Sequence, residues 1–495
     1  MDSLKNPLFL FLVLVTLIHC QEKSNRANHK PNILFLFTDD QTYLAVHALG
    51  NEVVQTPNMD RLIQRGTLFT HAYNMGGWNG AICTASRAMI ISGRSIWQAN
   101  RFRQQWLHGD TTALEMTWGR MMKKAGYATY MTGKWHVDAP ADQVFEIARH
   151  VRPGMPPDQW SQHTEDYMPP GYNRPRGPED TRWLPTDTTW GGYWSGGKHW
   201  SEVVRDDVLD YLHMASEDER PFFIYAAFNA PHDPRQSPQS YLDRYPVGDI
   251  PLPENWMPEY PDKEKIGAGA GLRDEALAPF PRTPYAIQKH RQEYYALITH
   301  LDDQIGQILD ALDRLGLSEN TYLFLTADHG LAIGSHGLLG KQNLFDHSIR
   351  VPLAMVGAGI PAGQGVDADV YLQDIMATAL DLASIPKPDY LFFHSLLGLA
   401  HGDQTTSSYD GIYGAYMDKQ RMIRKDGYKM LVYPEVPRIL LFDENKDPQE
   451  MTNLAGQESQ HDRVQSLWRK LREMQLSYQD TLVLPDSPEP WLMTN

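Results

Sequence analysis

Short apolar runs, each ending in a cluster of polar residues, recur along the chain and predict buried strands. Four of them are Asn32–Phe37 before Asp39-Asp40, Ala128–Met131 before Lys134-Trp135-His136, Phe222–Phe228 before Pro231-His232, and Tyr322–Thr326 before Asp328-His329. Runs without polar interruption are typical of strands that are buried on both faces. Between the strands, Pro57–Arg65 closes on Gly66, and Arg291–Leu315 carries apolar residues at three- and four-residue spacing, so both segments predict helices.

Strands that alternate with helices predict an α/β fold with a large, mostly parallel sheet flanked by helices. In such sheets the functional crevice lies beyond the carboxyl ends of the strands. All four polar clusters follow strand ends, so we expect them to meet there.

The pattern of apolar and polar residues changes after about residue 400. Gly411–Met417, Gln420–Lys425, Tyr428–Tyr433 and Ile439–Phe442 predict an antiparallel meander, and an amphipathic helix follows near Val464–Leu476. We therefore expect a catalytic domain over residues 31–400 and a small C-terminal α+β subdomain over residues 408–485.

Residues 150–286 are rich in proline and predict long loops on the domain surface. Five tryptophans crowd part of this region: Trp160, Trp183, Trp190, Trp194 and Trp200. They either pin the loops to the body or form a wall on which sugar rings stack, and the sequence leaves both readings open. Trp78, Lys198 and His199 are candidate substrate contacts.

The N-terminus predicts an export signal over residues 1–20. The apolar run Leu8–Ile18 is too short to span a bilayer and suits the hydrophobic region of a signal peptide. Leu17-Ile18-His19-Cys20 resembles a bacterial lipoprotein cleavage box, except that His19 stands where a small residue is expected. We expect a bacterial periplasmic protein or an outer-membrane lipoprotein, with a lipid on Cys20 as its only link to the membrane.

The composition of the chain excludes several classes of partner and of metal site. The 495 residues include 61 acidic and 45 basic side chains, for a net charge of −16, and only two cysteines. The acidic balance argues against a nucleic-acid partner. Two cysteines exclude a disulfide scaffold and a multi-cysteine zinc or iron–sulfur site. A polyanionic ligand would require cations gathered locally.

Basic side chains of this kind occur together with the polar residues that follow the predicted strands. Three carboxylates (Asp39, Asp40, Asp328) and three histidines (His136, His232, His329) accompany Arg87, Lys134 and Lys341. Hard oxygen ligands favour calcium or magnesium over zinc. Cations around that metal suit an anionic, tetrahedral group.

The segment Cys83-Thr84-Ala85-Ser86-Arg87 resembles the maturation signature of the formylglycine-dependent (type I) sulfatases, which belong to the alkaline-phosphatase-like superfamily. Ile91-Ser92-Gly93-Arg94 follows where that family carries a Thr/Ser-Gly-Arg element. Ala85 stands at the position of this signature where proline is commoner. Further family elements occur in the expected order: Asn32–Gln41, Thr56–Leu62, Thr132–His136, Asp328–Lys341, Arg350–Leu353 and Leu441–Leu454.

The resemblance implies specific roles. A maturation enzyme would oxidise Cys83 to formylglycine (3-oxoalanine), whose hydrate attacks sulfur. One Ca²⁺ would be held by Asp39, Asp40, residue 83, Asp328 and His329. Arg87 and Lys134 would hold the hydrate, and His136 would take the proton from its second hydroxyl. His232 and Lys341 would grip the sulfate and protonate the leaving alcohol.

The expected substrate is a sulfated carbohydrate, because the long loops and the export signal resemble those of bacterial polysaccharide sulfatases acting on ulvan or carrageenan. Three alternatives stay open at this point. One is a glycosaminoglycan sulfatase similar to iduronate 2-sulfatase, the second is a phosphonate or phosphate monoester hydrolase, and the third is a non-catalytic sulfated-glycan binding protein. The sequence does not indicate an oligomeric state.

Overall fold

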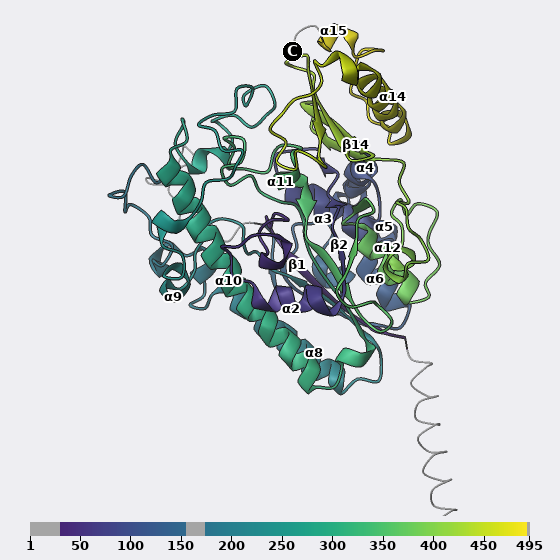
Figure 1. Cartoon of the computed structure of the whole chain (residues 1–495). Helices are drawn as coiled ribbons and strands as arrows, with labels where there is room; N and C mark the ends of the chain where they lie inside the picture. The colour runs from purple at the N-terminus through teal and green to yellow at the C-terminus, as the bar shows by residue number, and fades with distance from the viewer. Residues whose placement is uncertain (1–29, 155–173, 493–495) are drawn as a thin grey trace, which may run out of the picture.

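The computed structural model describes residues 30–154 and 174–492. The predicted export signal and Trp160 lie outside these residues. An eight-stranded sheet forms the centre, and most of its strands are parallel (Figure 1). Its order is β11 (Gln364–Val366), β2 (Thr67–Phe69), β10 (Leu353–Val356), β8 (Thr321–Ala327), β1 (Asn32–Thr38), β7 (Phe222–Ala227), β5 (Ala128–Lys134) and β6 (Ile147–Arg152).

The central strands β8, β1, β7 and β5 are mutually parallel and in register. Phe37 on β1 pairs with Ala227 on β7 and Thr326 on β8, and Ala227 pairs with Gly133 on β5. The carboxyl ends of these four strands therefore meet at one edge, where the polar clusters begin.

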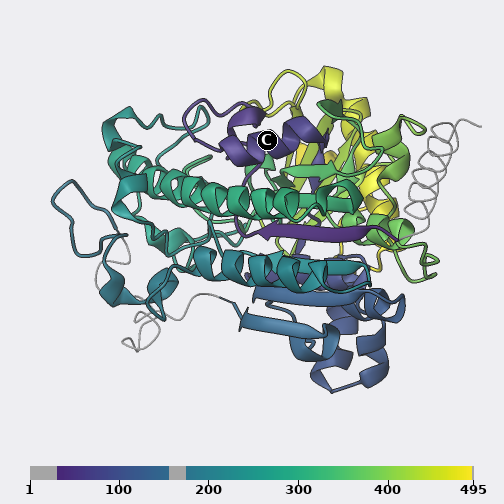
Figure 2. The same cartoon turned by 90° about the horizontal axis from the view of Figure 1, so that it is seen from below.

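Alternate residues of β1 pack against different layers. Leu34 and Leu36 join a cluster with Leu297 and Val208, whereas Phe35 and Phe37 face the opposite core. The first layer contains α2 (Pro57–Arg65), α8 (Trp200–Ser216) and α10 (Pro284–Arg314), and Figure 2 shows α8 and α10 running side by side.

The remaining α-helices are short or lie in the other layer and in the C-terminal part. They are α3 (Ile82–Ser92), α4 (Ile96–Leu107), α5 (Thr111–Glu115), α6 (Trp118–Lys124), α7 (Ala141–Val144), α9 (Gln239–Leu242), α11 (Asp346–Ile349), α12 (Asp374–Leu382), α13 (Leu397–His401), α14 (His461–Ser477) and α15 (Glu489–Leu492). A three-stranded sheet joins β12 (Val370–Tyr371), β3 (Ala72–Tyr73) and β9 (Arg350–Val351).

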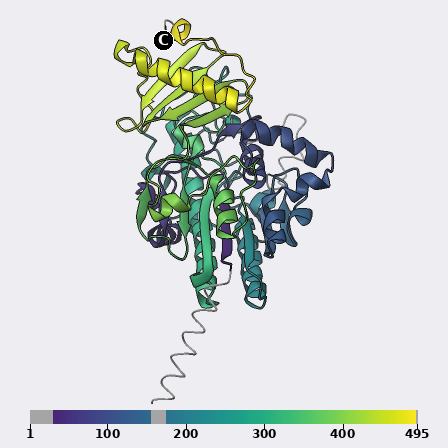
Figure 3. The same ribbon diagram turned by 90° about the vertical axis from the view of Figure 1, so that its right-hand side faces the viewer.

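The C-terminal meander forms its own sheet, on which α14 packs (Figure 3). Its order is β16 (Arg438–Asp443), β15 (Tyr428–Tyr433), β14 (Gln420–Lys425), β13 (Ile412–Tyr416) and β4 (Gly76–Gly77). The last strand comes from the segment just before Cys83, and it pairs in parallel with β13. The C-terminal sheet therefore supports the backbone that leads into α3.

The predicted fold class is confirmed. The helix predicted from Arg291 begins earlier, at Pro284, because Thr283 Oγ1 accepts the Ala286 amide and proline suits the first helical turn. No helix among the described residues is long and apolar enough to cross a membrane.

Candidate functional site

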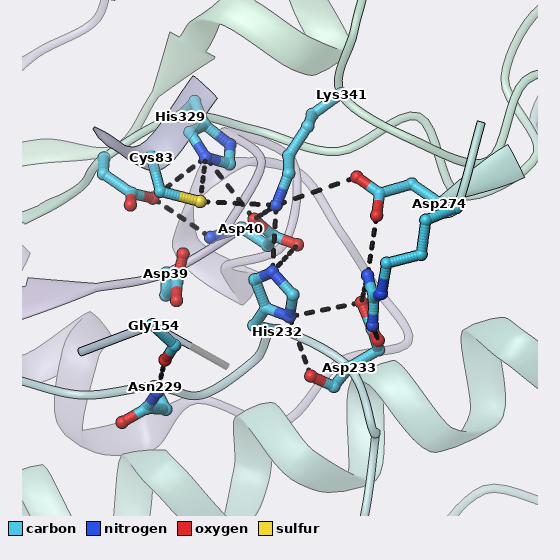
Figure 4. A network of polar contacts seen from close by, with 12 residues as sticks. Asp39, Asp40, Cys83, Gly154, Asn229, His232, Asp233, Asp274, His329 and Lys341 are labelled. Atoms are coloured by element: carbon cyan, nitrogen blue, oxygen red, sulfur yellow. Dashed lines mark hydrogen bonds and ion pairs between the residues drawn. The ribbon is translucent and has the colours of Figure 1, made fainter. Parts of the chain in front are cut away.

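Cys83 lies at the start of α3, in the second residue of the helix, and its side chain is buried. Its Sγ lies 3.2 Å from His329 Nε2 and 3.4 Å from Lys341 Nζ (Figure 4). Burial alone would raise the pKa of the thiol, but Lys134, Lys341 and His329 together hold it well below its ordinary value. The structure therefore places a cysteine in a cationic setting.

Three carboxylates surround Cys83, and each follows a strand end. Asp39 and Asp40 follow β1, and the Asp40 amide donates to Asp328 Oδ1 at 3.2 Å, after β8. Asp40 adopts a left-handed φ of 66°, which aspartate tolerates better than most residues. This turn brings adjacent aspartates on one strand to the same centre.

Arg87 lies one helical turn after Cys83 and ties α3 to two strand ends. Its Nε donates to Asp328 Oδ2 at 3.0 Å, and its Nη1 donates to the Lys134 carbonyl at 2.7 Å. Lys134 in turn contacts Asp39 through its ammonium group. All of these side chains are buried, and such charges need close pairing to offset their lost hydration.

His232 and Lys341 enter from two loops. Lys341 Nζ donates to Asp40 Oδ1 at 2.7 Å and lies 3.0 Å from His232 Nε2. Burial alone would lower the pKa of His232, but the Asp40 and Asp233 carboxylates together raise it to about 10. Together they present donors beside Cys83, as an anionic group requires.

His136 follows β5 with a left-handed φ of 52° and is half-buried. Its ring lies against Gly154, where a Cβ would come within 3.4 Å of Nε2. Its Nδ1 is buried without a hydrogen-bond partner among the described residues. The side chain is close enough to Cys83 to contribute to the lowered pKa of the thiol.

The donor atoms also fit a divalent cation. Two overlapping sets bring their ligand atoms within 4.8 Å of one another: Asp39, Cys83, Asp328 and His329, and Asp39, Asp40, Cys83 and His232. Asp39 Oδ1 is buried and accepts no hydrogen bond from the described residues. Burial and Asp328 raise the pKa of Asp39 even though Lys134 contacts it. Three buried carboxylates gathered around one centre, despite the cost of their burial, suit a hard cation such as Ca²⁺.

The candidate substrate residues are placed differently. His199 is fully buried; it accepts the Ser201 amide, contacts the Gln236 carbonyl at 3.0 Å and stacks on Tyr193. This placement corrects the expectation for His199, because both ring nitrogens serve as internal hydrogen-bonding groups. Lys198 is partly exposed and pairs with Asp206, whereas Trp78 is half-buried against the core.

Three further polar residues at the site were missed from the sequence. Asp233 contacts His232, Asp274 lies near Lys341, and Arg273 bonds to both carboxylates. Asp233 could have been noted, since it follows His232 directly. Arg273 and Asp274 lie in an irregular segment with no periodicity to mark them.

Comparisons with known proteins find matches that cover most of the chain. The family model described as Sulfatase matches residues 31–385, and one described as N-sulphoglucosamine sulphohydrolase, C-terminal, matches residues 334–477. An arylsulfatase of Clostridium perfringens is 29% identical, covering 88% of this chain and 93% of its own length. An ulvan-active sulfatase of Formosa agariphila is 27% identical, covering 90% and 82%.

The solved structure of a phosphonate monoester hydrolase from Silicibacter pomeroyi has a TM-score of 0.69 at 20% identity, covering 91% of this chain and 96% of that chain. This likeness shows a shared fold. The match to the Sulfatase model spans more than half of the chain. The chain belongs to the sulfatase family of sulfuric ester hydrolases.

Proposed function

We propose that this sulfatase hydrolyses sulfate esters of a sulfated polysaccharide or its oligosaccharides, with formylglycine at position 83 as its nucleophile. The observation that carries the proposal is the setting of Cys83. One buried thiol at a helix start lies within 3.4 Å of both His329 and Lys341, among three carboxylates. A structural cysteine has no need of such surroundings.

Formylglycine would supply an aldehyde whose hydrate carries two hydroxyls, one to attack sulfur and one to release the sulfate. Arg87 and Lys134 hold their positions through Asp328 and Asp39, so they can orient the modified side chain. His232 and Lys341 can hold sulfate oxygens and donate a proton to the leaving alcohol oxygen. The partnerless Nδ1 of His136 is available to accept a proton.

We assign one Ca²⁺ to Asp39, Asp40, residue 83, Asp328 and His329. When bound, the cation would neutralise the carboxylates and lower the pKa of a hydroxyl at position 83. The support is the donor set itself and the unsatisfied oxygen of Asp39.

For the substrate we favour a marine algal glycan such as ulvan. The ulvan-active relative supports this choice, as does the chemistry of the site. The chain carries a net charge of −16, yet Arg87, Lys134 and Lys341 gather at one centre, as a sulfated ligand requires.

A glycosaminoglycan is the second candidate substrate. The model that matches residues 334–477 is described by an N-sulphoglucosamine sulphohydrolase, an enzyme class named for an amino-sugar sulfate. This segment contains Lys341, so the resemblance includes part of the site.

We also propose that the protein is exported, with residues 1–20 as signal, and that a formylglycine-generating enzyme matures it. Residues 31–400 are the proposed catalytic domain and residues 408–485 the proposed subdomain. Ala85, in place of the commoner proline, bears on which maturation enzyme accepts the site.

The test begins with mass spectrometry of the peptide spanning Gly66–Arg87 from protein coexpressed with a maturation enzyme. We expect the aldehyde or its hydrate at position 83. The matured protein is then given ulvan oligosaccharides, sulfated glycosaminoglycan oligosaccharides and a phenyl phosphonate ester, and released sulfate or phenol is measured. Faster phosphonate hydrolysis, or an intact thiol in active protein, would overturn the proposal.

A further inference from the structure

Two nitrogen donors of the site are held unusually close together. Lys341 Nζ lies 3.0 Å from His232 Nε2, and the side chains are 3% and 4% exposed. Both nitrogens also lie near the Asp40 carboxylate, with Lys341 Nζ 2.7 Å from Oδ1 and His232 Nε2 3.7 Å from Oδ2. Polar groups this deeply buried and this close together keep their arrangement only where neighbouring groups satisfy and orient them.

Asp40 contacts both donors, and a further carboxylate lies beside each of them. His232 Nδ1 lies 3.1 Å from Asp233 Oδ1 and 2.7 Å from the Asp233 carbonyl. Lys341 Nζ lies 3.9 Å from Asp274 Oδ2. Figure 4 shows His232 between Asp40 and Asp233, and Lys341 between Cys83 and Asp274.

Arg273 joins these two outer carboxylates. Its Nη1 lies 3.2 Å from Asp233 Oδ1 and 2.7 Å from Asp274 Oδ1, and its Nη2 contacts Asp233 Oδ2. Burial raises the pKa of Asp233, but Arg273 and His232 hold it well below its ordinary value, so the carboxylate is ionised. Only a planar, forked guanidinium can bond to both carboxylates in this way.

We propose that Asp233, Arg273 and Asp274 form a positioning clasp that fixes the distance and orientation of His232 and Lys341. The clasp rests on the proposed function, in which those two side chains hold sulfate and protonate the leaving oxygen. Asp233 fixes the imidazole by its Nδ1, which leaves Nε2 toward Asp40 and Lys341. Asp274 attracts the ammonium group from 3.9 Å, and Arg273 keeps the two carboxylates at a set separation.

The clasp matters most when the leaving group is poor. As the sulfur–oxygen bond breaks, a phenol of low pKa leaves as its anion with little help, whereas a sugar alcohol needs a proton delivered in line. Misplacing the donors by a fraction of an ångström therefore penalises poor leaving groups more than good ones. A merely structural role would lower all rates equally through loss of folded enzyme.

The experiment measures kcat/KM of the matured enzyme on aryl sulfates whose phenol pKa increases stepwise. The variants are Asp233→Asn, Arg273→Met and Arg273→Lys. We expect Asp233→Asn and Arg273→Met to lose about tenfold or more on the poorest leaving group and much less on the best, giving a steeper dependence on phenol pKa. Lysine should restore little, because its single ammonium nitrogen cannot reproduce the two-nitrogen contact with Asp233 while it also bonds to Asp274.

Arg182→Met is the matched control, since Arg182 bonds to Asp180 at 2.7 Å in the same proline-rich part of the chain and is largely exposed. Circular dichroism and thermal unfolding identify any variant that fails to fold. An unchanged slope in folded Asp233→Asn and Arg273→Met enzymes would overturn the clasp.

A second measurement separates the clasp from the proposed function. Inorganic sulfate binding is measured by calorimetry on all variants. If the matured wild-type protein hydrolyses none of the aryl sulfates, sulfate binding decides the clasp; if it also hydrolyses none of the sulfated oligosaccharides, the proposed function fails. An affinity at least about tenfold weaker in the two variants than in Arg182→Met supports it, and equal affinities overturn it.

Discussion

His329 Nε2 lies 3.2 Å from Cys83 Sγ, although the residues are 246 positions apart in the chain. Burial lowers the pKa of His329, but Asp328 and the thiol raise it to about 9. The contact links the end of β8 to the start of α3. It therefore brings the signature around Cys83 to the strand-end carboxylates, which lie in separate parts of the sequence.

Replacing Cys83 with alanine should abolish sulfate-ester hydrolysis. Alanine keeps the helix start and cannot be oxidised to an aldehyde, so we expect kcat to fall by about a thousandfold or more while the fold is retained. Released sulfate and the thermal unfolding midpoint are measured on matured wild-type and variant proteins. Full activity in the alanine variant would exclude Cys83 as the nucleophile's precursor.

Removing divalent cations should inactivate the matured enzyme, and calcium should restore it. Asp39→Asn removes one charge from the donor set while keeping the shape of the side chain. We expect the calcium concentration needed for half-maximal reactivation to rise about 10- to 100-fold. This concentration is measured by titrating the chelator-treated enzyme with Ca²⁺ and Mg²⁺. Asp206→Asn is the control, because it makes the same substitution at the protein surface. Equal reactivation curves for wild type and Asp39→Asn would contradict the assignment.

Gly133 should tolerate no side chain. Its φ is +89°, and a Cβ would lie 1.9 Å from the Ala227 carbonyl oxygen on the neighbouring strand β7. Gly133→Ala must therefore push β5 away from β7, which displaces Lys134 from Asp39. We expect a loss of about 2 kcal/mol or more in the free energy of unfolding. Denaturant unfolding checks this, and Gly126→Ala, at a left-handed position with open space around it, separates backbone strain from the clash.

The meeting of the strand-end carboxylates was predictable from the sequence because its signal is local. Asp39 and Asp328 each follow an uninterrupted apolar run, and parallel strands in register bring such ends together. The sequence also placed α2 at its observed bounds, since proline and glycine mark its two ends.

The remaining features of the fold and of the site depend on contacts that leave no local pattern in the sequence. Gly76–Gly77 forms β4 through backbone pairing with β13, which two glycines do not reveal. Arg273 reaches the site from an irregular segment, where neither strand nor helix periodicity applies. His199 looked available because it stands in a loop rich in glycine and tryptophan, yet its ring is buried between Tyr193 and His300.

Stability should fall as the pH drops below neutrality, in part through His336. This side chain stacks on Phe345 with ring centroids 4.0 Å apart, and its Nε2 lies 3.0 Å from the Glu450 carbonyl. Burial lowers its pKa to about 4. The unfolded chain, with an ordinary histidine pKa of about 6.5, binds the proton first, so stability is lost as pH falls from about 6.5 toward 4. Between pH 7 and 5 we expect His336 to account for about 2 kcal/mol. Urea unfolding of wild type and His336→Gln across this range measures the difference, because glutamine can still donate to the carbonyl but does not titrate. Parallel pH dependences for the two proteins would show that His336 is not responsible.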